Sequence, residues 1–142
     1  MKFLDQLEPV GLLSLRVALA IIFVYHGYPK LVHPTAEMHD FFVAHDLPGY
    51  FVSVAGVLET FGGFLLLLGL FTRPVALLLA MEMVVVIWKV KMAAEFASVS
   101  VFEFEMLICG TCIALACLGA GMASLDFLVL KEKRPRTRRS ND

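Results

Sequence analysis

The sequence has little charge for its length and lacks the motifs from which most redox cofactor sites are built. Asp, Glu, Lys and Arg make up 18% of the 142 residues, whereas 59% are hydrophobic. We find no glycine-rich nucleotide-binding loop, no haem-attachment motif and no spacing of ligands that specifies a metal site. These absences exclude the common self-contained redox enzymes, and any electron donor must therefore be a separate protein. Nothing in the composition favours nucleic-acid binding.

Cysteine is scarce, and Cys109, Cys112 and Cys117 all lie in one apolar segment. A disulfide framework on the outer side of a membrane is therefore excluded. Cys109 and Cys112 form a C-x-x-C pair on one helix face and could act as a redox dithiol. An apolar environment disfavours the reactive thiolate, however, and the chain has no second cysteine pair to exchange electrons with. We expect packing roles, with the dithiol as the less favoured alternative.

Long apolar segments dominate what is present. The mean hydropathy is +0.80, and a membrane-spanning helix needs about 20 predominantly apolar residues. The first segment lacks a small-residue cleavage site and should remain as a helix. We therefore predict an all-α membrane protein with one domain, residues 1–131, built as a four-transmembrane-helix bundle. The predicted spans are 11–32, 50–71, 74–92 and 101–122.

The connections and the tail indicate how the bundle is oriented. Met38, Phe41, Phe42 and His45 have amphipathic helical spacing, which predicts a short helix in the outer interface. Lys and Arg near membrane ends mark the cytoplasmic side, and an even number of spans places both termini there. We predict a basic, disordered cytoplasmic tail over 132–142. The basic residues at this end are Lys131, Lys133, Arg134, Arg136, Arg138 and Arg139.

Ionisable residues occur inside the apolar segments, where each costs about 2.5 to 3.5 kcal/mol on insertion. Such residues normally face the interior of a bundle or a cavity. Arg16, His26 and Lys30 fall on one face of the first predicted helix. The others lie in the second, third and fourth helices: Glu59, Glu82, Lys89, Glu103 and Glu105.

Two interpretations of these residues stay open. In the first, they form structural ion pairs, such as Glu59 with Lys30 or His26, and Arg16 with Glu82 or Asp126. In the second, the outer cluster lines a pocket in which a carboxylate and an imidazole bind a polar head group and exchange protons. A quinone site requires these properties.

Four motifs, in order and at consistent spacing, resemble the DoxX family of small four-helix membrane proteins. They are "LRVALAIIFVYHGYPKL", with Arg16, Phe23, His26, Gly27 and Lys30; "LETFGGFLLLLGLFTRP", with Glu59; Glu105, at the matching acidic position; and "LGAGMASLD". The resemblance implies a bundle in the cytoplasmic (inner) membrane. Family members include a subunit of a thiosulfate:quinone oxidoreductase and proteins that assemble with soluble thiol- or superoxide-handling enzymes. Glu82 and the cysteine pair are not part of this resemblance.

Two functional hypotheses follow. The first is a quinone-linked redox subunit without an intrinsic cofactor, in which Glu59, His26 and Glu105 are the candidate catalytic residues. The second is a non-catalytic membrane partner that recruits a soluble oxidoreductase. A solute carrier is less favoured, because four short helices would have to form a homo-oligomer to enclose a path. Candidate binding residues are Arg16, His26, Lys30, Glu59, Glu82, Lys89 and Glu105.

Overall fold

The computed structural model describes residues 2–92 and 99–132, and all regular structure within these ranges is helical. The basic tail predicted over 132–142 lies almost entirely outside the described residues. The elements are α1 (Lys2–Val32), α2 (Ala36–Ala44), α3 (Phe51–Leu68), α4 (Thr72–Val86), the π-helix η1 (Ile87–Lys91), α5 (Val99–Leu118) and α6 (Leu125–Glu132).

Three of the helices are long and apolar enough to cross a membrane. They are the Leu7–Val32 part of α1, the whole of α3 and the whole of α5. This confirms the prediction of an all-helical membrane protein. Helix α4 has 15 residues, fewer than a span of about 20 residues requires, but it continues directly into η1.

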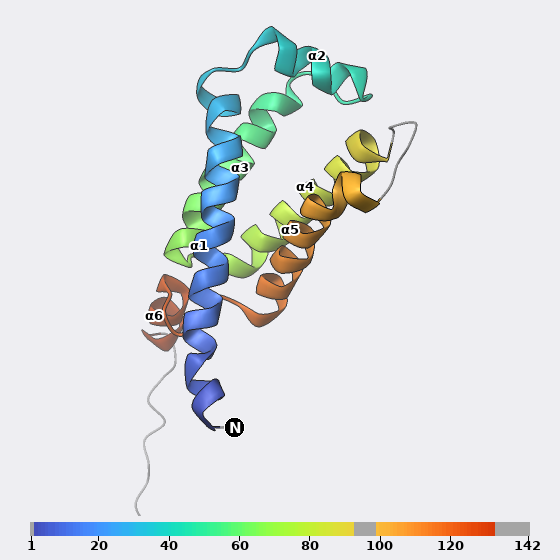
Figure 1. The fold of residues 1–142 in the computed structure, drawn as a ribbon. Helices are drawn as coiled ribbons and strands as arrows, with labels where there is room; N and C mark the ends of the chain where they lie inside the picture. Colours follow the sequence, from blue (N-terminus) through green and yellow to red (C-terminus); the bar gives the residue numbers. More distant parts are fainter. Residues whose placement is uncertain (1, 93–98, 133–142) are drawn as a thin grey trace, which may run out of the picture.

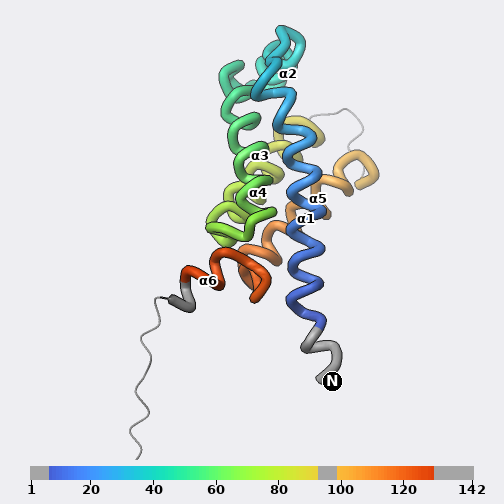
Figure 2. Tube along the Cα trace, turned by 90° about the vertical axis from the view of Figure 1, so that its left-hand side faces the viewer, coloured from blue at the N-terminus to red at the C-terminus, as the bar shows by residue number. Residues whose placement is uncertain are grey.

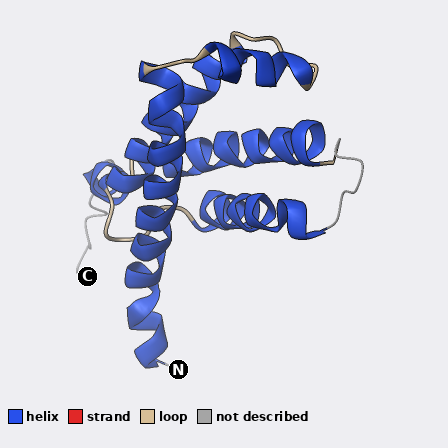
Figure 3. Ribbon diagram, turned by 45° about the horizontal axis from the view of Figure 1, so that its top comes forward, coloured by secondary structure: helices blue, strands red, loops and turns tan. Residues whose placement is uncertain are grey.

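The long helices form two antiparallel pairs, α1 with α3 and α4 with α5 (Figure 1). The second pair is strongly tilted relative to the first, as Figure 3 shows. The pairs approach each other near α6 and diverge toward α2, which lies across the opposite end (Figures 1 and 2). We call these two ends of the molecule the α6 end and the α2 end. Helix α1 begins at the α6 end.

Glycine allows α1 and α3 to pack with their backbones close together. A Cβ atom on Gly27 of α1 would lie 2.5 Å from the Cβ of Glu59 and 2.7 Å from the backbone nitrogen of Thr60. Across the same contact, a Cβ on Gly56 would lie 2.8 Å from the backbone nitrogen of Leu31. Small residues are the usual means of close helix packing in membranes, and Gly27 and Gly56 have this role between α1 and α3.

The turn between α3 and α4 is held by α6. Helix α3 ends at Leu68 because Gly69 adopts a left-handed conformation with φ 66°. The backbone N–H groups of Phe71 and Thr72 donate to the two carboxylate oxygens of Asp126, at 2.8 and 2.9 Å. Asp126 therefore caps α4, which begins at Thr72, two residues before the predicted start at Pro74.

The connection at the α2 end forms a short helix, as its amphipathic spacing predicts. The side chain of Thr35 caps α2 by accepting a hydrogen bond from the backbone N–H of Met38 at 3.3 Å. Helix α2 contains no fully buried residue. Its side chains are therefore available to contact lipid or a ligand.

Candidate functional site

An ion pair between Lys30 and Glu59 joins the two most closely packed helices near the α2 end. The Nζ atom of Lys30, in the last turn of α1, lies 2.6 and 2.7 Å from the two carboxylate oxygens of Glu59 on α3. The Glu59 side chain is 5% exposed and that of Lys30 is 24% exposed. The structure thus pairs Glu59 with Lys30, whereas His26 donates elsewhere. Contact between the two helices at Gly27 and Gly56 places the pair in register.

A cavity of about 140 Å³ lies beside this ion pair, in the space between the two helix pairs. We call it the inter-pair cavity. It brings together residues from α1, α3, α4 and α5, and therefore exists only in the folded molecule. Its polar groups are His26, Lys30, Glu59 and Glu105, and its apolar walls are Ile22, Phe23, Met83, Val86, Phe104 and Ile108.

His26 contributes an imidazole to the rim of the cavity. Its Nδ1 atom lies 2.9 Å from the backbone carbonyl oxygen of Ile22, one turn earlier in α1. Because a carbonyl oxygen only accepts hydrogen bonds, Nδ1 carries a proton in this arrangement. In the neutral ring, Nε2 is then the atom that can accept a proton or a hydrogen bond from a ligand.

Glu82 lies behind the ion pair and does not line the cavity. Its carboxyl group is within electrostatic reach of both Glu59 and Lys30. Its buried Oε2 atom has no hydrogen-bond partner in the described part of the chain. Glu82 is one of the predicted binding residues, and the structure places its carboxyl group close to that of Glu59.

Glu105 reaches the cavity from α5 and pairs with Lys91 at 3.0 Å. Its Oε2 atom is likewise buried without a hydrogen-bond partner among the described residues. Sequence analysis did not assign Lys91 to the site and proposed Lys89, which instead lies 5.3 Å from the ring centre of Trp88. The π-helical turn changes the register: the N–H of Met92 bonds to the carbonyl of Ile87, five residues back. Lys91 is therefore the lysine that pairs with Glu105, and a binding role for Lys89 stays a prediction.

The charges around the inter-pair cavity do not balance if every group is ionised. Glu59, Glu82 and Glu105 supply three carboxylates, and Lys30 and Lys91 supply two ammonium groups. One proton on a carboxyl group, or on a ligand held there, would neutralise the cluster. Because unbalanced charge in a membrane interior is costly, this arrangement is suited to taking up and releasing protons. The described residues contain no group of three or more His, Cys, Asp or Glu that could hold a metal ion.

Arg16 lies apart from this cluster, at the α6 end. It is 1% exposed and donates hydrogen bonds of 2.8 to 2.9 Å to four backbone carbonyl oxygens, those of Leu66, Leu67, Ala120 and Ala123. It therefore fastens the C-terminal end of α3 to the segment that follows α5. Arg16, one of the predicted binding residues, does not line the inter-pair cavity, because residues on one helix face can still be far apart along the helix axis.

The cysteine pair lies in the packed interface between α4 and α5. Cys109 and Cys112 are both buried thiols, and Cys117 is exposed. The Sγ atom of Cys109 lies 3.6 Å from the backbone carbonyl oxygen of Ala80 on α4. Neither cysteine lines the inter-pair cavity. These contacts account for both residues as packing groups; a redox role for the dithiol stays a hypothesis.

Comparison with known proteins identifies the family. The DoxX family model matches residues 11–92. The Bacillus subtilis protein named "Putative oxidoreductase CatD" is 35% identical over 88% of this chain and 91% of its own length. A Haemophilus influenzae protein is 32% identical over 93% and 100% of the two chains, and the Escherichia coli "Inner membrane protein YqjF" is 29% identical over 91% and 99%. No solved structure gives a significant match. The chain belongs to the DoxX family of membrane proteins.

Proposed function

We propose that the protein is a quinone-linked redox subunit and that the inter-pair cavity binds the quinone head group. The cavity itself carries this proposal. A quinone ring is flat and apolar and has two carbonyl oxygens, so its site needs apolar walls together with hydrogen-bond donors. Phe23 and Phe104 supply walls, Lys30 supplies a donor, and His26 would become a donor at Nε2 when its ring is protonated.

The same residues supply the proton chemistry that quinone reduction needs. Conversion of a quinone to a quinol takes up two electrons and two protons. Glu59 and Glu105 line the cavity and would exchange protons with the ring oxygens. Glu82, behind Glu59, would hold a further proton that Glu59 can pass on. The electrons would come from a soluble oxidoreductase that carries its own redox cofactor.

The membrane placement that we propose follows from the helices and the relatives. Helix α4 and η1 together form the fourth span, because Thr72–Val86 run without a break into Ile87–Lys91. The α6 end, where Arg73 lies, faces the cytoplasm. A relative is named as an inner membrane protein and another as an oxidoreductase with the qualifier "putative". These names favour an inner-membrane redox role.

Glu59→Gln tests the proposed site. The substitution keeps the shape of the side chain but removes its charge, so Lys30 loses its partner and a proton-exchanging group disappears. We expect the affinity for a short-chain benzoquinone to fall about tenfold. Quenching of Trp88, the only tryptophan of the chain, reports binding in detergent. Glu103→Gln is the matched control, because Glu103 is exposed and does not line the inter-pair cavity.

The result also separates the two hypotheses. Equal affinities for the wild type and the Glu59→Gln variant, combined with a lower unfolding temperature for the variant, would make Glu59 a purely structural residue. Absence of quinone binding by the wild type would contradict the proposal. It would favour the non-catalytic membrane partner, which predicts a soluble oxidoreductase that copurifies in fixed stoichiometry.

A further inference from the structure

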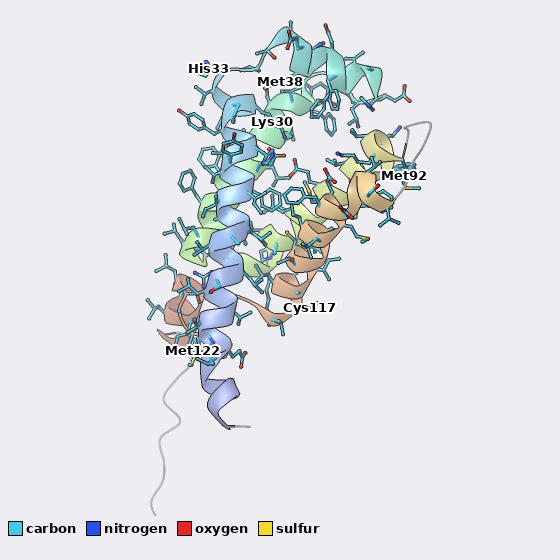
Figure 4. The ribbon with its side chains drawn as sticks, in the orientation of Figure 1. Lys30, His33, Met38, Met92, Cys117 and Met122 are labelled. Atoms are coloured by element: carbon cyan, nitrogen blue, oxygen red, sulfur yellow. The ribbon has the colours of Figure 1, made fainter. Side chains whose placement is uncertain are left out.

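A second, larger cavity adjoins the inter-pair cavity at the α2 end. Its volume is about 550 Å³. Met38 and Phe42 of α2 and Leu47 line one side, and Val86 and Val90 of α4 and η1 line the other, with Lys30 at its edge. Figure 4 shows Lys30 on α1 below Met38 of α2. We call this space the α2 groove.

The two spaces are neighbours, because Lys30 and Val86 line both of them. Four ionisable side chains line the smaller inter-pair cavity. The α2 groove is also lined by Lys30, Glu37 and Lys91, but most of its wall is apolar: Met38, Phe41, Phe42, Leu47, Val86 and Val90. A ligand that fills both would have a small polar head and a long apolar chain.

Their sizes indicate the same ligand shape. The inter-pair cavity, at about 140 Å³, is smaller than the roughly 300 Å³ at the low end of ordinary ligand pockets. It can hold a head group but not a complete quinone with its side chain. The adjoining groove has nearly four times that volume.

We propose that the ligand is a long-chain membrane quinone whose isoprenoid side chain lies in the α2 groove, between α2 and η1. The inference rests on the proposed function and specifies its substrate class. Helix α2 then covers the isoprenoid side chain. Lys30 lies where the side chain joins the head group in the inter-pair cavity.

Blocking the groove tests this placement better than lengthening the ligand. Lipid and detergent are as apolar as the groove, so a side chain need not raise the affinity in wild-type protein. A bulky residue in the groove, in contrast, would exclude the side chain and leave the head-group site open. Val90→Trp is the blocking variant, because Val90 lines the α2 groove but not the inter-pair cavity.

The experiment measures calorimetric binding of two quinones with the same ring, one without a side chain and one with several isoprene units, at one detergent concentration. Val90→Trp should weaken binding of the long-chain quinone about tenfold and change binding of the other less than twofold. Val84→Trp, an identical change at an exposed site of α4, should leave both affinities unchanged. Met38→Trp blocks the groove from α2 and replaces Val90→Trp if that variant does not fold.

The outcomes distinguish this inference from the proposed function. If the blocking variant binds both quinones as the wild type does, or loses affinity for both equally, the side chain does not lie in the groove and the inference is wrong. Binding of the short quinone to the wild-type protein would still support the head-group site. If the wild type binds neither quinone, the proposed function fails and the inference fails with it.

Discussion

At the scale of single residues, two cations of α1 are stabilised in different ways: Arg16, buried near the middle of the helix, and Lys30, partly buried in its last turn. Arg16 donates to four backbone carbonyl oxygens, which suits the fixed, planar array of donors of a guanidinium. Lys30 donates to both oxygens of Glu59, and the pair borders a cavity. Arg16 therefore holds elements together, whereas Lys30 lies where a ligand can bind.

Arg16→Lys should destabilise the protein although the charge is kept. A lysine has one compact donor group and cannot satisfy carbonyl oxygens on two separate segments, so buried acceptors lose their partners. We expect a loss of about 2 kcal/mol in the free energy of unfolding, measured by denaturation in mixed micelles. Arg73→Lys is the control, because Arg73 is exposed and makes a single long bond of 3.5 Å to Leu118. Equal losses in both variants would contradict the role assigned to Arg16.

At the scale of elements, η1 decides which lysine joins the site. Its wider turn follows Val86, the last residue of α4. Lys91 therefore reaches Glu105 at 3.0 Å, while Lys89 lies against Trp88. π-helical turns recur at functional sites in proteins, and this one lies beside both cavities.

A double-mutant cycle tests the register that η1 imposes. Lys91→Gln and Glu105→Gln should show a coupling energy of about 0.5 to 1 kcal/mol, because the pair is partly exposed at 31% and 16%. The same cycle with Lys89→Gln in place of Lys91→Gln should give a value near zero. A larger coupling for Lys89 would mean that η1 is a regular α-helical turn in solution.

The elements also show how far the sequence predicts this molecule. Apolar length predicted the long helices, and amphipathic spacing predicted α2, because both depend on local periodicity. Buried charges on facing helices predicted that Glu59 pairs with Lys30 or His26, and the structure shows Lys30. The position of Arg16 did not follow from the sequence. A shared helix face says nothing about distance along the axis, and the rise of 1.5 Å per residue puts about 21 Å between Arg16 and Lys30. Lys91 was missed because no residue in 87–91 signals a π-helix.

At the scale of the whole molecule, hydrogen bonds fasten the helix pairs together at one end, and the proposed ligand cavities lie toward the other. Arg16 and Asp126 bind backbone groups where the helix pairs meet, at the α6 end. Toward the α2 end the pairs diverge (Figure 1), and the two cavities lie in the resulting space. The residues of the DoxX-like motifs therefore form two groups. Arg16 and Asp126 have a structural role at the α6 end, and the residues of the candidate ligand site lie toward the α2 end: His26, Lys30, Glu59 and Glu105.

Photolabelling with a quinone that carries an azide on its ring tests the central claim most directly. If the head group occupies the inter-pair cavity, the label will be found by peptide mass spectrometry on the segments that contain His26 and Phe104, and excess unlabelled quinone will suppress it. Label on lipid-facing side chains such as Phe61 and Phe64, which are 58% and 49% exposed, with no suppression by competitor, would contradict a specific quinone site in this protein.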